Sequence, residues 1–173
     1  MKLSKARTFR LDVDLDEAID KIAAEERVSL NQVANKAFRK YVEWDKAPTN
    51  RGLVSVPSML LVKLMAGHTE GEAHALGRWA GRELFLPNIK AGYPTLSLEN
   101  VERMVRMLGD YGGRFTFDHR VDDGRHTITV GQKMGKNWSI YYAGAMEAIF
   151  EDFLGKKHME TISDNICVVE FKE

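Results

Sequence analysis

The chain opens on a basic segment whose side chains alternate in character. Four of its first ten residues are lysine or arginine, and none is acidic. In "KARTFRLDV", residues 5–13, Phe9 and Leu11 alternate with Thr8 and Arg10, and side chains two residues apart share one face of a strand. The pattern therefore predicts a strand with an apolar face and a cationic face, placed directly before a helix.

Two amphipathic helices are predicted after this strand. Apolar residues recur at the spacing of one helix face over about 13–26, and Asp14 with Glu17 forms a capping-box pattern at the start. A second set begins after Ser29, a residue type that favours a helix N-terminus, and indicates a helix over about 30–45.

The composition changes after the second helix. The stretch "DKAPTNRG" combines Pro, Gly and polar residues without periodicity, and it predicts a linker over residues 46–52. With 173 residues and 44% hydrophobic content, the chain is long and apolar enough for a small and a medium domain. We therefore expect one domain over residues 1–45 and a second over residues 53–173.

The order of strand, helix, tight turn and second helix resembles the ribbon-helix-helix family of DNA-binding proteins. The resemblance covers residues 5–44, on "RLDVDLDEAIDKIA" and "RVSLNQVANKAFRKYV". In that family two chains pair their strands into an antiparallel ribbon, which lies in the major groove of double-stranded DNA. A module this small also has too little core to stand alone. The resemblance therefore implies a homodimer, alone or within a tetramer.

Alternation and the family alignment assign the same residues to the DNA-facing side of the strand. The outward positions, expected to contact bases, are Ala6, Thr8 and Arg10. Arg10 suits bidentate contact with guanine, and Thr8 suits a thymine methyl group or a base acceptor.

Phosphate contacts are expected from basic residues of the first strand and from the start of the second helix. The resemblance places Ser29 and Asn31 at the family's phosphate-anchoring positions, where free backbone N–H groups favour an anion. The full set of expected phosphate contacts is Lys2, Lys5, Arg7, Ser29 and Asn31. Where the family usually has glycine between its helices, this chain has Arg27, whose left-handed conformation would cost roughly 1 kcal/mol.

Overall charge neither adds to this interpretation nor opposes it. The formal net charge is zero, so DNA binding rests on the local concentration of basic residues near the N-terminus. The single cysteine, Cys167, excludes an intramolecular disulfide, and no apolar run is long enough for a membrane span. We expect a soluble, cytoplasmic protein with no membrane partner.

Residues 53–173 predict an α+β domain with a small antiparallel sheet, in the order β-α-α-α-β-β-α-β from a short "LVSV" strand onward. The clearest signal is "GRFTFDHRVDDGRHTITVGQ", in which two alternating strands flank Asp123-Gly124, the favoured pair for a type I′ hairpin turn. A helix from about Asn137 to Gly155 is apolar on most sides and should be buried. Thr69 with Glu72 predicts the start of a helix that runs to about 86 and stops before Pro87, and a further helix is predicted after Ser97. Along the first of these, Ala73, Gly77 and Gly81 recur every four positions and would let another backbone approach closely.

The hairpin brings two histidines close together. The turn pairs Val121 with His126 and His119 with Ile128, which makes the histidines diagonal neighbours on one face. They could begin a metal or anion site; the candidate further ligands are Cys167, His158, His68 and His74. Alternatively, both histidines are bonded to neighbours within the sheet, and no short Cys/His spacing supports zinc. No metal or cofactor is therefore assigned.

Catalytic motifs are absent from the sequence. There is no nucleophile elbow or HExxH, and "GDYGGRF" lacks the Lys-Ser/Thr of a phosphate-binding loop. The aromatic residues Trp138, Tyr141 and Tyr142 could line a ligand pocket or fill the core. We therefore do not expect an enzyme.

A second resemblance concerns the C-terminal part. "HTITVGQKMGKNWSIYYAGAMEAIFEDFLG", together with the final strand, is similar to small-molecule-sensing domains related to vinyl reductases. This implies a ligand-sensing domain. The cysteine cluster of the metal-using members is missing, so neither a ligand nor a metal is carried over.

Three functions remain open. The first is a transcriptional regulator, with a ribbon-helix-helix dimer and a C-terminal domain that senses a small-molecule effector or extends the dimer. The second is the antitoxin of a toxin–antitoxin pair, in which the C-terminal part would wrap a toxin. The third is an enzyme that its N-terminus only dimerises. The regulator accounts for more of the sequence, because residues 53–173 have the pattern of a folded domain.

Overall fold

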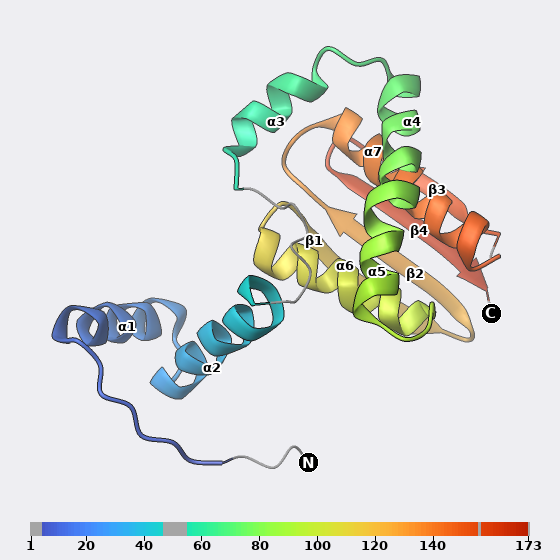
Figure 1. The fold of residues 1–173 in the computed structure, drawn as a ribbon. Helices are drawn as coiled ribbons and strands as arrows, with labels where there is room; N and C mark the ends of the chain where they lie inside the picture. Colours follow the sequence, from blue (N-terminus) through green and yellow to red (C-terminus); the bar gives the residue numbers. More distant parts are fainter. Residues whose placement is uncertain (1–4, 47–54, 156, 173) are drawn as a thin grey trace. The chain divides into compact units, whose positions relative to one another are not determined.

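The structure is a computed structural model that describes residues 5–46, 55–155 and 157–172. The fold is α+β, with helices preceding and flanking one small antiparallel sheet. The chain divides into two compact units, Met1–Ala47 and Pro48–Glu173, and the elements of each can be followed in Figure 1. Most of the predicted linker lies outside the described residues.

The first unit is a helical hairpin. Helix α1 spans Val13–Glu26, and α2 spans Leu30–Lys40 and continues as the π-helical segment η1, Tyr41–Asp45. Both predicted helices are therefore confirmed. Arg27, between them, has a φ of 54°, so it adopts the left-handed conformation for which the family uses glycine.

The structure does not show two local features that were expected of the first unit. Residues 5–12 form no strand in the single chain, because a strand is defined by ladder hydrogen bonds and this segment has no neighbouring strand within its own unit. The capping box of Asp14 and Glu17 is also not formed. The helix begins two residues earlier than such a box requires, with Asp12 at its N-cap and no side-chain cap bond.

The second unit contains the remaining helices and the sheet. Its α-helices are α3 (Ser58–Met65), α4 (Glu70–Ala80), α5 (Leu86–Gly92), α6 (Leu98–Gly112) and α7 (Lys136–Glu147). Two π-helical segments follow α4 and α7, namely η2 (Gly81–Phe85) and η3 (Ala148–Phe153). The strands are β1 (Thr116–Asp122), β2 (Arg125–Gly131), β3 (Met159–Ile162) and β4 (Ile166–Lys172).

The sheet is antiparallel throughout, in the order β1-β2-β4-β3. The predicted hairpin register is confirmed, with Val121 opposite His126 and His119 opposite Ile128. Asp123 and Gly124 both have positive φ, 46° and 70°, as a type I′ turn requires.

Two predictions about element boundaries in the second unit are corrected. Ser55 and Val56, the described half of the expected "LVSV" strand, lie in no strand, and Leu53 and Val54 lie outside the described residues. The fourth strand is instead β3, which is too short to give a clear alternation. The helix expected to stop before Pro87 is followed directly by η2 and then by α5. Pro87 lies in the first turn of α5, where proline costs no backbone hydrogen bond.

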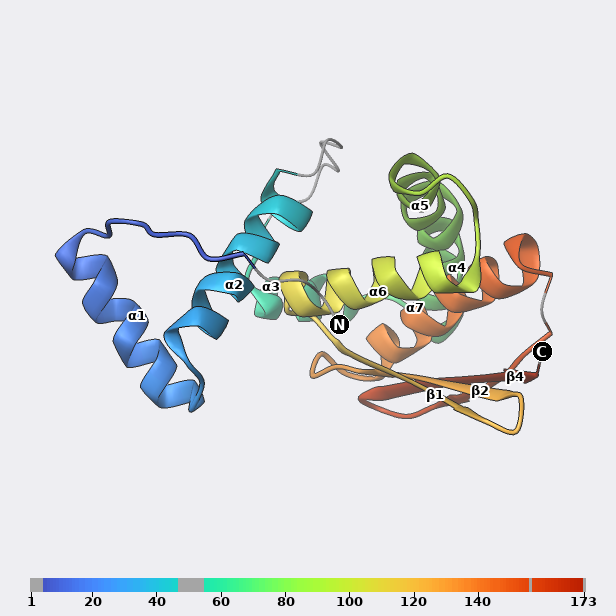
Figure 2. The same ribbon diagram turned by 90° about the horizontal axis from the view of Figure 1, so that it is seen from below.

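Helix α7 forms the centre of the second unit. Helices α4, α5, α6 and α7 lie on one face of the sheet (Figure 2). Eight residues of α7 are buried, as its sequence predicts. The small-residue spacing on α4 is confirmed as a contact surface. A methyl group at Gly77 would overlap the carbonyl of Tyr141, and one at Gly81 would lie 2.8 Å from the carbonyl oxygen of Ala145. The glycines therefore let α4 and α7 pack with their backbones in contact.

Candidate functional site

The basic segment of the first unit is open to solvent. Every described residue from 5 to 12 is exposed, including the expected base contacts Ala6, Thr8 and Arg10 and the expected phosphate contacts Lys5 and Arg7. None of these side chains makes an ion pair with a described residue. Lys2 lies outside the described residues.

The start of α2 has the geometry of a capped but accessible helix N-terminus. The Ser29 hydroxyl accepts a hydrogen bond from the backbone N–H of Gln32 at 3.3 Å, and the Ser29 N–H donates to the Gln32 side chain at 2.8 Å. Asn31 is exposed, and its carbonyl accepts a bond from the Asn35 amide at 2.7 Å. The structure brings Ser29 and Asn31 to one end of α2, while the basic segment lies before α1.

Apolar side chains of the first unit are left uncovered. Ala23 is the one buried residue among described residues 5–46. Large apolar side chains are exposed by 41% to 75%; they are Phe9, Leu11, Val13, Leu15, Ile22, Leu30, Phe38, Tyr41 and Val42. Phe9 lies against Phe38 of α2, with ring centroids 5.4 Å apart. The hairpin has an apolar side but almost no interior of its own.

The hairpin histidines form a hydrogen-bonded pair in the second unit. His119 Nε2 and His126 Nδ1 lie 3.0 Å apart, and His119 Nδ1 lies 2.6 Å from the Glu102 carboxylate on α6. His126 stacks on Phe171, with ring centroids 4.6 Å apart. The predicted closeness of the two histidines is therefore confirmed. Glu102 was not predicted, because nothing in the sequence relates α6 to the hairpin.

No metal site is visible around this pair. Within the described ranges, no group of three or more His, Cys, Asp or Glu side chains is arranged to hold a metal ion. Cys167 pairs with Val130 in the sheet, four positions along β4 from the partner of His126, which is about 13 Å of strand. Burial raises the pKa of the Cys167 thiol to about 12. The thiol is therefore protonated and distant from the histidines.

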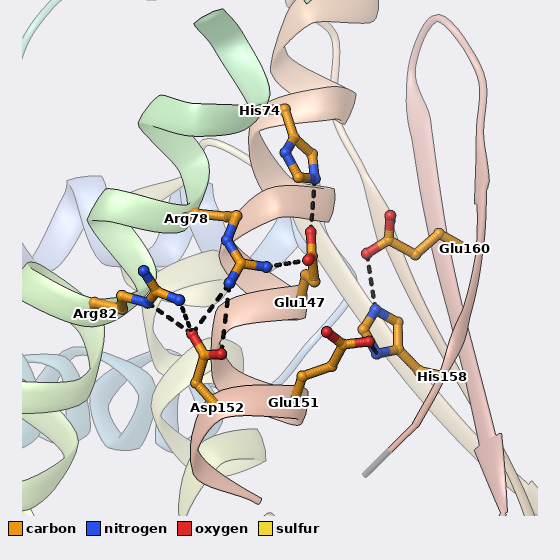
Figure 3. A network of polar contacts seen from close by, with 8 residues as sticks. All are labelled: His74, Arg78, Arg82, Glu147, Glu151, Asp152, His158 and Glu160. Carbon is orange, nitrogen blue, oxygen red and sulfur yellow. Dashed lines mark hydrogen bonds and ion pairs between the residues drawn. The ribbon is translucent and has the colours of Figure 1, made fainter. Parts of the chain in front are cut away.

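A network of ion pairs joins α4 and η2 to α7 and η3 (Figure 3). His74 Nε2 lies 2.8 Å from the Glu147 carboxylate, which also pairs with Arg78. Asp152 accepts from Arg78 at 3.3 Å and from Arg82 Nε at 2.6 Å. The positive and negative side chains of this network are paired with one another, so we interpret the network as a structural contact between the helices.

The remaining histidine candidates are also engaged in local contacts. His158, with a side chain 2% exposed, lies 3.0 Å from Glu160 and 3.7 Å from Glu151. His68 Nδ1 lies 3.1 Å from the carbonyl oxygen of Leu64 at the end of α3. Among the described residues, neither His158 nor His68 joins the hairpin histidines in a group that could hold a metal ion.

The second unit also contains a cavity of about 210 Å³, which we call the aromatic cavity. Its apolar lining comes from η2, α6, the start of the hairpin and α7, and consists of Leu84, Phe85, Met104, Leu108, Phe115 and Trp138. Its polar lining is Asn88, Arg114, Tyr141 and Tyr142. Trp138, Tyr141 and Tyr142 were candidate pocket residues from the sequence, and all three line this cavity.

The hydroxyls of the two tyrosines remain in their neutral form. Burial raises the pKa of Tyr141 to about 12, and it raises the pKa of Tyr142 further, while the nearby Arg114 charge acts in the opposite direction on both. Neither hydroxyl hydrogen-bonds to a described residue. The cavity therefore offers two neutral donors beside one guanidinium.

Comparison with models of known protein families finds no match, and a search of curated proteins finds no significantly similar sequence. Among the described residues, no helix is both long and apolar enough to cross a bilayer. The function is therefore argued from the geometry of the chain itself.

Proposed function

We propose that this protein is a sequence-specific DNA-binding transcriptional regulator. Its first unit acts as a ribbon-helix-helix homodimer, and its second unit binds a small-molecule effector. The observation that carries the proposal is the first unit's lack of an interior: two amphipathic helices and a basic alternating segment expose nine large apolar side chains and bury only Ala23 among described residues 5–46.

A second copy of the chain is the occupant that this apolar side fits best. Isolated units of this size bury too little surface to be stable, and a symmetric partner offers the same apolar side chains in return. Pairing of two Lys5–Asp12 segments would also supply the ladder hydrogen bonds that one segment lacks. The first unit is thus proposed to fold together with its twin.

The same pairing gives the basic side chains a direction. Phe9 contacts Phe38 of α2, so in an extended segment its neighbours Thr8 and Arg10 point to the opposite face. Arg10 gives that face its positive charge, and Lys5 and Arg7 add to the charge of the same short run, which has no acidic residue before Asp12. A paired ribbon with this outer face suits the major groove of DNA.

The second unit supplies a place for an effector. The aromatic cavity of about 210 Å³ has aromatic walls and hydrogen-bond donors without partners among the described residues, which is the composition of a small-molecule site. An effector that binds there alters DNA binding only if its affinity differs between the DNA-bound and free forms.

The proposal is tested by selecting duplexes bound by the full chain from a random DNA pool. We expect an enriched sequence with two half-sites, since a two-fold symmetric dimer reads a two-fold symmetric site. Arg10→Ala should then weaken binding to that sequence by about 1–3 kcal/mol, or roughly fivefold to 150-fold.

Arg120→Ala is the matched control, because Arg120 is an exposed arginine of the second unit that pairs with Asp118. This variant should bind the selected sequence as the wild type does. Failure to enrich any sequence, or equal affinity of the wild type and Arg10→Ala, would refute the proposal.

A further inference from the structure

We infer that the aromatic cavity of the second unit binds a small aryl monocarboxylate, with the carboxylate held by Arg114 and the hydroxyls of Tyr141 and Tyr142. The inference rests on the part of the proposed function that gives this unit a ligand. It does not depend on DNA binding by the first unit.

The polar groups of the cavity converge on one region. Arg114 acts electrostatically on both tyrosine hydroxyls, and the two tyrosine rings are packed edge to face, with centroids 5.4 Å apart. All three residues line the same cavity. A carboxylate accepts hydrogen bonds through two oxygens and suits a planar guanidinium in particular.

The hydroxyl of Tyr142 is the observation that points to a ligand. The residue is 8% exposed, lines the cavity and makes no hydrogen bond to a described residue. This hydroxyl is not among the fully buried polar atoms without a partner, so it is accessible to a ligand that enters the cavity. Other polar groups of the lining are already used: the Trp138 indole donates to the carbonyl of Leu61 at 3.3 Å, and the Asn88 amide donates to that of Leu84 at 2.7 Å.

Charge decides between classes of ligand. Arg114 is the one charged side chain of the lining, and no carboxylate is among the lining residues. A cationic ligand would meet only like charge, and a doubly charged phosphate ester would be half neutralised. A neutral alcohol would use the hydroxyls but leave Arg114 without a counter-charge. A monoanion matches the guanidinium one to one.

The volume and the lining of the cavity indicate that the apolar part of the ligand is an aromatic ring. An apolar cavity of roughly 150 Å³ is enough to admit benzene, and this cavity measures about 210 Å³. The additional volume corresponds to a carboxylate and a short connection. The walls present rings at packing distances, with Phe115 and Tyr142 centroids 5.1 Å apart and those of Trp138 and Tyr141 also 5.1 Å apart, so an aromatic body can pack edge to face against them.

The test is isothermal titration calorimetry of the full-length protein with a matched ligand set. The carboxylates are benzoate, phenylacetate and 3-phenylpropionate, and the matched neutral and cationic compounds are 2-phenylethanol and 2-phenylethylamine. We expect at least one carboxylate to bind at least tenfold more tightly than the alcohol, with the amine weakest. The inference is overturned if none of the carboxylates binds, or if the alcohol binds as tightly as the best of them.

Variants locate the binding. Arg114→Gln should weaken carboxylate binding about tenfold to a hundredfold, the range for a charged hydrogen bond, with little effect on the alcohol. Tyr142→Phe keeps the ring and should weaken carboxylate binding severalfold. Arg120→Gln, an exposed arginine of the same unit, should change nothing. Unaltered carboxylate affinity in Arg114→Gln would also overturn the inference.

The two proposals can fail separately. Arg10→Ala should keep full affinity for the carboxylate while losing affinity for DNA. If the DNA selection fails but the carboxylate binds and responds to Arg114→Gln, the ligand site stands without the regulator. If DNA binds and no carboxylate does, the regulator stands and the ligand assignment is wrong.

Discussion

At the scale of single residues, the thiol of Cys167 illustrates how burial determines chemistry. Cys167 is 1% exposed. It belongs to β4, which lies between β2 and β3 in the sheet. Loss of hydration disfavours the thiolate and raises the pKa to about 12. Since the thiolate is the reactive form, the folded protein should hold this cysteine inert.

We therefore predict that native protein at pH 8 reacts with Ellman's reagent far more slowly than protein unfolded in guanidinium chloride. The unfolded chain should release one equivalent of chromophore, because it has one cysteine. Rapid stoichiometric reaction of the native protein would contradict the buried position of Cys167.

Glu102 shows what sequence reasoning missed at this scale. The histidine pair follows from the period-two alternation around Asp123-Gly124 and could be predicted. Its carboxylate partner comes from α6 and depends on how a helix packs on the sheet, which no local pattern encodes. The same limit applies to Arg114, which lies just before β1 and completes the polar lining of the cavity.

Glu102→Ala should lower the free energy of unfolding by about 1–3 kcal/mol, because it removes a partner of the largely buried His119 imidazole. Urea denaturation followed by circular dichroism measures the change. Glu99→Ala, at an exposed position of the same helix, is the control and should stay within about 0.5 kcal/mol of the wild type.

At the scale of elements, the contact between α4 and α7 is the most exacting packing in the second unit. The spacing of small residues on α4 predicted a close approach, but only the structure identifies α7 as the partner. A methyl group added at this contact changes both the packing and the helix propensity of α4. Gly71 of the same helix separates the two effects, because a methyl group there would have no neighbour within 4 Å.

Gly77→Ala should destabilise the protein by about 1–3 kcal/mol despite the better helix propensity of alanine, because the new methyl group would force α4 away from α7. Gly71→Ala should instead be stabilising, by up to about 1 kcal/mol. Thermal unfolding of the two variants compares them directly. Equal shifts of the melting temperature would show that packing at Gly77 is unimportant.

Elements differed in how well the sequence specified them. Helices α1, α2, α6 and α7 and the β1–β2 hairpin were predicted, because each combines a clear period with a turn or cap signal. Strand β3 was missed, since four residues are too few to show a period. The continuation through Pro87 was missed because proline ends a helix in most contexts and is tolerated only in a first turn.

At the scale of the whole molecule, the two units differ in what completes their cores. The second unit buries side chains from its sheet, α7 and η3, including Phe150, Ile128 and Val169, whereas the described part of the first unit buries only Ala23. On the proposed pairing, the missing interior of the first unit comes from another chain, which no single-chain pattern could specify beyond the presence of exposed apolar residues.

Leu11→Asp should convert a dimer into a monomer in sedimentation-velocity experiments, because it places a charge in the proposed shared interior. It should abolish binding to the selected DNA while the second unit stays folded. Met159→Asp replaces an equally apolar, exposed residue of β3 and should leave the dimer intact. A wild-type chain that sediments as a monomer at micromolar concentration would rule out the pairing.

On the proposed pairing, the scarcity of buried side chains in the described part of the first unit would make assembly of that unit depend on the concentration of the chain. The second unit has its core within one chain. A DNA-binding unit built from two chains would instead form at a rate that rises with the square of the chain concentration. A cell with few copies would then hold effector-binding monomers, and only accumulation of the protein would switch on operator occupancy, so the chain would measure its own supply before it regulates anything else.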